Sequence, residues 1–392
     1  MPKAAGLSLA TLLGLALLAA AGPLGMDMFL PSLPEITREF ETTAPTTQLG
    51  ITSFMVGMGL GQLIIGPMSD RLGRKKLLIG GAVVGLGASL VCATAPTVGV
   101  WIIARGFQGA AGGTGVVLAR AMVADRSEGT QAAKAYSLMM TIVGVAPVLA
   151  PLIGAAVAGM SGWRGVFWLL VAIAIAQLAV AVWLPESHPE DQRTAGGPAT
   201  TIRAMGSLLR MPAFVGHAMV FGLGFGAMFA FIAGSSVVLQ EQLGLSAAAY
   251  SVMFAMNASA LILTNVAGAR LVNRFRPQAL QRAGVILVSS GAAALVVVTF
   301  AVPAAPAVVA CTFVLTSGTA LCMVHSTALA QGLAHGKQGA ASALLGAVQF
   351  AVGGSVSPAV ALGENTLLTM AIVMAVCAAG AVAGRLLVAA RG

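Results

Sequence analysis

The sequence predicts an all-α membrane protein made of two six-helix halves. Of its 392 residues, 58% are hydrophobic and only 8% are charged, whereas a typical soluble domain carries about 25% charged residues. Its uncharged runs repeatedly reach the roughly 20 residues that a helix needs to cross a bilayer. Its basic residues fall in the loops between those runs. This pattern predicts a membrane protein and argues against a nucleic-acid partner, although the net charge is +9.

Twelve apolar segments are expected to cross the membrane as helices. The first resembles a secretory signal, since it follows Lys3, but the count and the charge pattern agree when it is kept as a span. Proline alone separates the third span from the fourth (Pro96) and the ninth from the tenth (Pro303 and Pro306). The twelve segments are residues 7–31, 48–68, 77–95, 98–119, 135–158, 164–184, 213–238, 247–269, 282–301, 304–328, 338–361 and 366–388.

The basic residues orient these spans. With the N-terminus inside, eighteen of the 21 Lys and Arg residues lie on the cytoplasmic side. Arg38 and Arg164 are external, and Arg105 lies within a span. Cytoplasmic loops of membrane proteins carry the excess of Lys and Arg. Both termini are therefore predicted to be cytoplasmic.

The longest polar stretch in the middle of the chain runs from Pro185 to Arg210 and includes a Gly-Gly-Pro sequence. It predicts a cytoplasmic linker (185–210) between an N-terminal lobe (1–184) and a C-terminal lobe (211–392). The loops at 66–76 and 268–276 both begin with glycine and are rich in arginine. Two pseudo-symmetric lobes of six helices are typical of secondary transporters.

Asp27 is the most unusual residue of the first span, because no other charge occurs between Leu7 and Met26. A carboxylate within lipid is costly and usually functional. Asp27 precedes Glu35, the first external charge, by eight residues, or about 12 Å of helix, and Arg105 follows Pro96 by nine, or about 13 Å. The two charges are thus expected at similar depth, either paired directly or sharing a water-filled cavity. Asp27 and Arg105 are the candidate proton-coupling residues; the alternative is a static buried pair.

The sequence contains no pattern for ATP or metal chemistry. Gly336-Lys337 is followed by Gln, so no P-loop is present. The four cysteines fit no metal or disulfide spacing. No paired His/Asp cluster or long soluble segment supports the alternatives of a membrane enzyme or a receptor. We therefore expect no enzyme activity, catalytic residue, metal or cofactor. Transport is expected either to draw its energy from an ion gradient, with the proton as the candidate ion, or to be passive.

The loop from Gly66 to Lys76 (GPMSDRLGRKK) resembles the signature between helices 2 and 3 of the major facilitator superfamily. Gly66 and Gly73 allow a tight turn between closely packed helices. The resemblance implies the major facilitator fold and a cytoplasmic gate. It assigns that gate to Gly66, Asp70, Arg71, Gly73 and Arg74.

Two further motifs resemble elements of this superfamily. The sequence from Arg105 to Gly109 (RGFQG) is similar to its R-x-x-Q-G element. In the fifth span, Gly144, Pro147, Pro151 and Gly154 share one helical face, which resembles the antiporter motif of drug exporters. A tight packing seam without a coupling role is the alternative, since small residues let helices approach closely.

Finer matches resemble the Bcr/CflA group of drug–proton antiporters: DMFLPSLP from Asp27, PVLAPLIG from Pro147, GWR from Gly162 and LPES from Leu184. This resemblance implies a bacterial cytoplasmic-membrane protein that exports amphipathic drugs, such as chloramphenicol or bicyclomycin, by alternating access. A related antiporter has a second acid where this chain has Ala19, which favours neutral or zwitterionic drugs. The alternative is a transporter of a small metabolite: a sugar, a nucleobase or an amino-acid derivative.

The expected partners are a small amphipathic drug, protons and the lipid bilayer, with the chain acting as a monomer. Methionine is soft and adaptable, which suits a promiscuous cavity, and polar residues within spans are further candidates. His217 and His325 are expected to form hydrogen bonds between helices. The predicted cavity residues are Met26, Met55, Met58, Gln62, Tyr136, Met139, Asn257 and Gln349.

Overall fold

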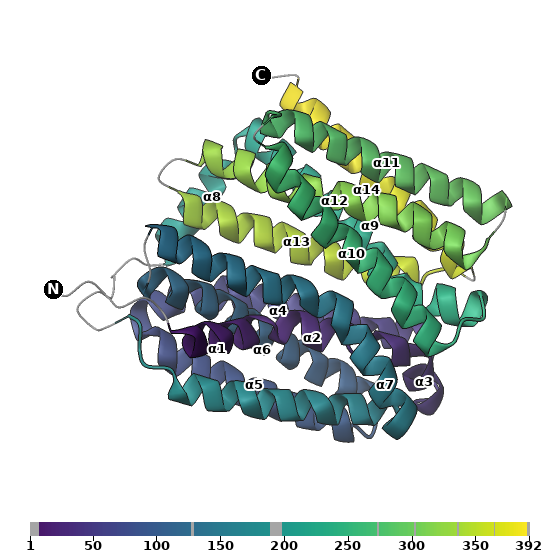
Figure 1. Ribbon diagram of the computed structural model, residues 1–392, viewed down its shortest axis with the longest axis horizontal. Helices are drawn as coiled ribbons and strands as arrows, with labels where there is room; N and C mark the ends of the chain where they lie inside the picture. Colours follow the sequence, from purple (N-terminus) through teal and green to yellow (C-terminus); the bar gives the residue numbers. More distant parts are fainter. Residues whose placement is uncertain are drawn as a thin grey trace. The chain divides into compact units, whose positions relative to one another are not determined.

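The structure is a computed structural model that describes residues 8–126, 129–188, 198–272, 274–301, 303–334, 337–363 and 365–389. These residues form helices, turns and short connections without any strand, as predicted (Figure 1). Each predicted span falls on helix within the described ranges. The elements are α1 Leu9–Ala19, α2 Ala21–Asp27, η1 Leu30–Ser32, α3 Leu33–Glu39, α4 Ala44–Leu72, α5 Arg74–Thr94, α6 Val98–Arg126, α7 Gly129–Trp183, α8 Pro198–Leu209, α9 Pro212–Ser236, η3 Val237–Gln242, α10 Ala247–Leu271, α11 Pro277–Ala301, α12 Ala305–Leu333, α13 Gln338–Val360 and α14 Thr366–Ala389.

The first predicted span is a broken helix. Ser8 caps its start, where the hydroxyl accepts a hydrogen bond from the backbone N–H of Thr11 at 3.2 Å. The helix axis bends by 41° between α1 and the segment that starts with α2. Pro23 explains the break, because it has no N–H to donate to the carbonyl of Ala19, the last residue of α1. The break places Asp27 at the end of a separate short helix.

The fifth and sixth predicted spans both lie in α7. The helix is interrupted at Gly162, whose φ of 69° is accessible mainly to glycine. By length and hydropathy, nine helices of the described ranges qualify as membrane spans, and ten when the bent pair α1–α2 is joined. The predicted twelve also count α6, which carries Arg105 and Gln108. They divide α7 between residues 158 and 164, the interval that contains Gly162.

The contacts of the chain group it into two compact units: Met1–Thr42 with Ser53–Gly197, and Thr43–Thr52 with Pro198–Gly392. In the first unit, α5 packs on α6 and α7, and α1 packs on α6 and α7. Glycine allows α4 and α6 to approach at backbone distance. A Cβ on Gly57 would overlap the carbonyl oxygen of Gly106, and one on Gly109 would overlap that of Phe54. This contact fixes the neighbourhood of Arg105.

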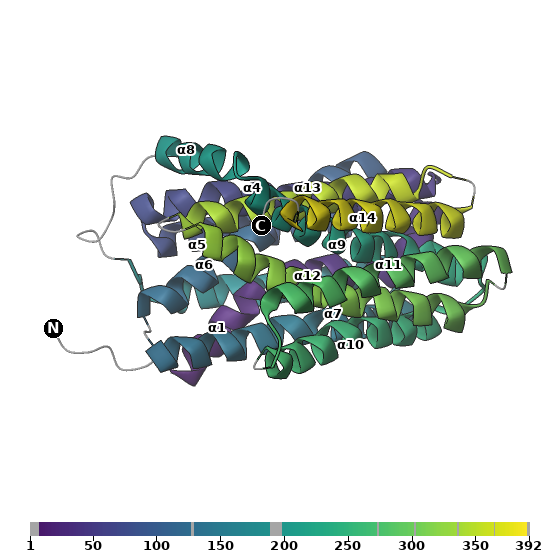
Figure 2. The same cartoon turned by 90° about the horizontal axis from the view of Figure 1, so that it is seen from above.

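In the second unit, α9 packs against α12, α13 and α14, and α11 packs against α12 (Figure 1). A Cβ on Gly284 would lie 2.8 Å from the carbonyl oxygen of Gly318, so α11 and α12 also pack closely. The unpredicted helix α8 occupies the second half of the predicted linker (Figure 2). Its Leu208 is buried in a core with Phe214 and Ala330. Burial of this apolar residue explains why part of a polar linker is helical.

Candidate functional site

Arg105 is the best-enclosed charge among the described side chains of the first unit. Its side chain is fully buried, and its guanidinium carbon lies 4.2 Å from the ring centre of Phe29 and 4.4 Å from that of Phe54. Trp101 and Phe167 lie at 6.0 and 5.9 Å. Aromatic faces attract a desolvated cation by about 2 kcal/mol. Rings from four helical segments therefore hold a permanent positive charge inside the helix bundle.

The hydrogen bonds of Arg105 use only one of its three guanidinium nitrogens. Nη1 donates to the carbonyl oxygen of Gly25 at 2.8 Å and to Oε1 of Gln108. Nε and Nη2 are buried and have no hydrogen-bond partner in the described part of the protein. Buried donors without partners are costly. The site therefore has unused capacity to bind an anionic or polar group.

Asp27 lies at the end of α2, two residues after Gly25, and is only 5% exposed. Arg105 donates a hydrogen bond to the carbonyl oxygen of Gly25, two residues before Asp27, so its guanidinium lies close to this end of α2. Among the described residues, however, no ion pair within 4.0 Å and no hydrogen bond joins the two side chains. Of the two arrangements that the sequence left open, the structure has no direct pair. The carboxylate is thus near a cation but not locked to it.

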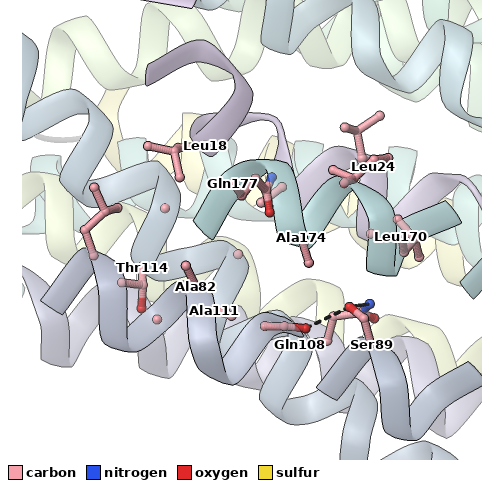
Figure 3. Close-up of a pocket in the computed structure, with 18 residues that line it drawn as sticks. Leu18, Leu24, Ala82, Ser89, Gln108, Ala111, Thr114, Leu170, Ala174 and Gln177 are labelled. Atoms are coloured by element: carbon pink, nitrogen blue, oxygen red, sulfur yellow. Dashed lines mark hydrogen bonds between the residues drawn. The ribbon is translucent and has the colours of Figure 1, made fainter. Parts of the chain in front are cut away.

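A polar chain runs from Arg105 into a pocket within the first unit. Nε2 of Gln108 donates to Oγ of Ser89 at 2.9 Å, and this hydroxyl donates to the carbonyl oxygen of Gly85 at 2.8 Å. Gln108 and Ser89 line the pocket with Thr114 and Gln177, among glycine, alanine and larger aliphatic residues (Figure 3). No predicted cavity residue lines it. The Arg105 network thus reaches a mainly apolar pocket that the sequence did not reveal.

The predicted antiporter face is built into the same region. A Cβ on Gly154 would overlap the carbonyl oxygen of Met28, the residue after Asp27. Pro151 is buried one turn earlier in α7, and Pro147 is half-buried. Helix α7 therefore touches the backbone that carries Asp27. Gly144 lies in α7, but its surroundings fall outside the described side chains.

The predicted gate motif forms the end of α4 and the start of α5. Gly73 separates the two helices with a φ of 88°, which explains the need for glycine. Arg71 is exposed, whereas Arg74 is 7% exposed and forms an ion pair with Asp125 of α6, with Nε 3.2 Å from Oδ2. Its Nη1 also donates to Oγ of Ser69. The side chain of Asp70 lies outside the description.

Glu186, just after α7, caps the N-terminus of α5. Its two carboxylate oxygens accept hydrogen bonds from the backbone N–H groups of Arg74 at 2.9 Å and Lys75 at 3.1 Å. Burial by itself would raise the pKa of Glu186, but the N–H groups of His188, Arg74, Lys75 and Ser187 outweigh it and hold that pKa below its usual range. The carboxylate is therefore charged when it caps the helix.

Ser187 and Arg126 extend this cluster at the predicted cytoplasmic end of the first unit. The hydroxyl of Ser187 donates to Oδ2 of Asp125 at 2.8 Å, and Nη2 of Arg126 donates to the carbonyl oxygens of Pro185 and Glu186 at 2.7 and 3.1 Å. The cluster thus joins α4, α5, α6 and the segment after α7. Sequence reasoning did not single out Asp125, and it included Glu186 only within the LPES match, without a role. The available signal was an acid within a few residues of the end of a predicted span.

The predicted cavity residues have varied surroundings. Met139 lies in the core of the first unit, and the methyl group of Met58 lies beside Gly22 and Gly112. The amide of Asn257 is engaged by α12: Nδ2 donates to Thr312 at 2.7 Å, and Oδ1 accepts from Thr316 at 2.8 Å. The cavity itself stays a prediction. Met26 and Met55 are buried, Gln62 and Gln349 are half-buried, and the side chain of Tyr136 lies outside the description.

Comparison with protein families gives one match that covers most of the chain. The profile of the Major Facilitator Superfamily matches residues 15–358. An uncharacterized MFS-type transporter of Bacillus subtilis, YdgK, is 35% identical over 379 residues, covering 95% of this chain and 93% of that protein. The bicyclomycin resistance protein homolog of Haemophilus influenzae is 28% identical over 371 residues, covering 93% and 92%.

A third relative and two solved structures complete the comparison. Multidrug resistance protein D of Escherichia coli is 32% identical over 245 residues, covering 62% of this chain and 61% of that protein. The fold is similar to a bacterial homolog of the human lysosomal transporter Spinster, with a TM-score of 0.71, 16% identity and coverage of 97% and 94%. It is also similar to a D-xylose–proton symporter, with a TM-score of 0.65, 18% identity and coverage of 95% and 97%.

Proposed function

The chain belongs to the major facilitator superfamily, and from this premise we propose that it is a proton-coupled exporter of amphipathic antibiotics. Membership makes it a multi-pass transporter of a bacterial inner membrane with the all-α fold of that superfamily. Relatives named for resistance to bicyclomycin, chloramphenicol and multiple drugs support an antibiotic as substrate. Ala19, where a related antiporter has a second acid, favours neutral or zwitterionic drugs.

The burial of Asp27 and its lack of an ion-pair partner are the observations that support proton coupling. Its carboxylate is almost fully buried yet has no ion-pair partner among the described side chains. Burial and the nearby charge of Arg105 act in opposite directions on proton binding. A carboxyl group balanced in this way can exchange a proton during a cycle. A locked ion pair could not do so without first breaking apart.

In the proposed cycle, an external proton loads Asp27 and releases the drug to the outside. The protonated carrier then returns to the inside, where drug and proton compete. Arg105 holds a positive charge beside the site in both halves of the cycle. The contact of Gly154 with the backbone at Met28 provides a route by which movement of α7 displaces the helix end that carries Asp27.

The test is transport in proteoliposomes with an imposed pH gradient, using chloramphenicol and bicyclomycin as substrates. We expect drug movement to drive proton release in the native chain, and Asp27→Asn to abolish that release. Glu41→Gln, which removes an exposed carboxylate of the same unit, is the matched control and should behave as the native chain. Undiminished drug-driven proton release by Asp27→Asn would overturn the coupling role. Gradient-driven transport of a sugar, with neither antibiotic moved, would favour the metabolite alternative.

A further inference from the structure

One end of the second unit carries a basic rim, which includes Arg282 of α11 and Arg385 of α14. The unit has few acids to neutralise these charges. From residue 198 to the C-terminus the sequence contains only two acids, Glu241 and Glu364. Gly216, near the start of α9, packs against Gly384 of α14, the residue before Arg385. Glu241 follows α9, at the opposite end of that helix. Glu241 is therefore too far from this rim to pair with it.

Two arginines of this rim lie on neighbouring helices. Arg282 is in the second turn of α11, Arg385 is near the end of α14, and the two helices pack against each other. Neither side chain forms an ion pair with any described residue. Two like charges on helices that pack together, without a described acid as partner, form a pair that an anion would stabilise.

Buried polar groups beside these arginines are incompletely bonded. The Nε of Arg385 is buried and has no hydrogen-bond partner in the described ranges. The fully buried Gln281, next to Arg282, donates from Nε2 to Nδ1 of His217 at 3.0 Å and to Oγ of Ser326 at 2.7 Å. Its Oε1 has no described partner. Because the amide nitrogen of Gln281 donates this hydrogen bond, Nδ1 of His217 accepts it and carries no proton. The positive charge at this rim therefore comes from the arginines.

The surface beside the pair is apolar. Ile286 lies one turn after Arg282 and is 66% exposed, and Leu386 follows Arg385 and is 63% exposed. A charged pair at the end of two spans, bordered by exposed aliphatic side chains, matches a phosphate attached to hydrocarbon chains. A free phosphate would gain nothing from the aliphatic side chains. The guanidinium fork of arginine binds phosphate oxygens with two parallel hydrogen bonds.

We propose that the phosphate of an anionic phospholipid headgroup binds between α11 and α14, at Arg282 and Arg385, with its acyl chains along Ile286 and Leu386. The predicted topology places this end of the helices in the cytoplasmic leaflet, where anionic lipids attract basic residues. The site is independent of the drug and proton sites of the proposed function. It would anchor the second unit to the membrane surface.

The experiment is native mass spectrometry of the purified full-length protein titrated with phosphatidylglycerol, phosphatidylcholine and sodium phosphate. We expect phosphatidylglycerol to bind and the double variant Arg282→Gln/Arg385→Gln to lower its affinity roughly 30-fold. The double Lys variant should retain most of the affinity. The matched control Arg38→Gln/Lys76→Gln, which removes two basic residues of the first unit, should change it less than about twofold.

Two outcomes would overturn the proposal: equal phosphatidylglycerol affinity in the native and double-Gln proteins, or displacement of the lipid by millimolar phosphate, which would indicate a free-anion site. If the double-Gln variant is not monodisperse, Arg282→Gln alone replaces it. This side chain is exposed and forms no described hydrogen bond or ion pair, and its loss should lower the affinity about fivefold. An unchanged affinity in that variant would also contradict the site.

Discussion

The spans of the two units bury different kinds of polar group. The spans of the first unit hold two charges, Asp27 and Arg105, each at most 5% exposed. The described spans of the second unit hold neutral clusters in comparable burial, such as Asn257 with Thr312 and Thr316. In the neutral cluster both amide atoms of Asn257 are bonded, whereas two nitrogens of Arg105 are not. Satisfied neutral groups hold helices together, while unsatisfied charges remain available for chemistry.

The same contrast recurs at the predicted cytoplasmic ends. The first unit neutralises its basic motif internally, through Asp125 on Arg74 and Glu186 on the start of α5. Among the described residues of the second unit, no acid pairs with Arg282 or Arg385. The polar bonds of the first end are made within the protein, as a gate that opens and closes would require. In the proposed lipid site, a phosphate from outside the protein neutralises the second end.

Of the variants proposed to test this contrast, replacement of Arg105 should reduce gradient-driven transport the most. Arg105→Gln keeps a bond to Gly25 within reach but removes the charge beside Asp27. If Asp27 exchanges protons, gradient-driven transport should fall roughly 100-fold, the scale of a lost acid–base partner. Arg105→Lys should recover only part of it, because an ammonium group cannot stack between Phe29 and Phe54 as a planar guanidinium does. Proteoliposome transport measures both variants.

The matched variant in the second unit is Thr319→Val. Thr319 is fully buried, and its hydroxyl donates to the carbonyl oxygen of Gly224 at 2.9 Å. Its loss should cost about 1 kcal/mol of unfolding free energy and leave proton coupling unchanged. Loss of proton coupling in Thr319→Val, or its retention in Arg105→Gln, would contradict the assignment of proton coupling to the buried charges of the first unit.

The contact of α7 with the Asp27 segment gives the next largest effect. Gly154→Ala places a methyl group on the carbonyl oxygen of Met28, so the backbone must move. Overpacking of this kind costs about 1–3 kcal/mol, and transport should fall with it. Gly159→Ala, in the same helix with open space around the new Cβ, should change stability by less than about 0.5 kcal/mol. Thermal unfolding in detergent and transport should be measured together.

This pair of variants also separates two interpretations of the glycine face. A packing seam predicts that transport by Gly154→Ala recovers once the protein is stabilised, for example at lower temperature. A coupling element predicts that drug transport persists while drug-driven proton release is lost. Equal stability and equal transport of Gly154→Ala and Gly159→Ala would show that the contact of α7 with Met28 contributes neither to packing nor to coupling.

The sequence predicts more of the fold than of the site. Apolar length locates the spans, and the break at Gly162 lies between residues 158 and 164, where the sequence predicts the end of one span and the start of the next. The charges Asp27 and Arg105 are visible because each interrupts an apolar run. Helix α8 was missed, because a polar linker gives little sign that Leu208 will be buried.

Tertiary partners are what sequence reasoning could not supply. Asp125 lies 51 residues from Arg74, and Glu186 lies 112 residues from it. Neither spacing indicates a contact, because the partners meet only when separate helices pack. The rings around Arg105 likewise come from distant segments, including Phe29 and Phe54. Their apolar character predicts burial but not the cation they surround.

Breaking the Arg74–Asp125 ion pair at the predicted cytoplasmic end should have a smaller effect than replacing Asp27 or Arg105 within the spans. Asp125→Asn leaves Arg74, only 8% exposed in its side chain, without its carboxylate. A double-mutant cycle with Arg74→Gln should give a coupling energy of about 1–2 kcal/mol. The comparison pair Arg164–Glu39, with side chains 34% and 47% exposed, should give less than about 1 kcal/mol. Equal coupling energies in the two cycles would show that the Arg74–Asp125 pair stabilises the first unit no more than an exposed ion pair does.

The smallest predicted effect concerns the cap that Glu186 places on α5, and it depends on pH. The pKa of Glu186 is lower in the folded protein than its usual value of about 4.3, so its stabilising effect is fully present above that value and is lost as the pH falls through the folded pKa. At pH 7, Glu186→Gln should cost about 1 kcal/mol or less, since the partly exposed carboxylate is screened by solvent. Thermal unfolding from pH 7 to pH 3 should show the native protein and the variant converging at the acid end. Exposed Glu41→Gln should show no such convergence. A difference that grows as the pH falls would mean that Glu186 does not act as a charged cap, and the first unit would lose one of the two acids that distinguish its cytoplasmic end from that of the second.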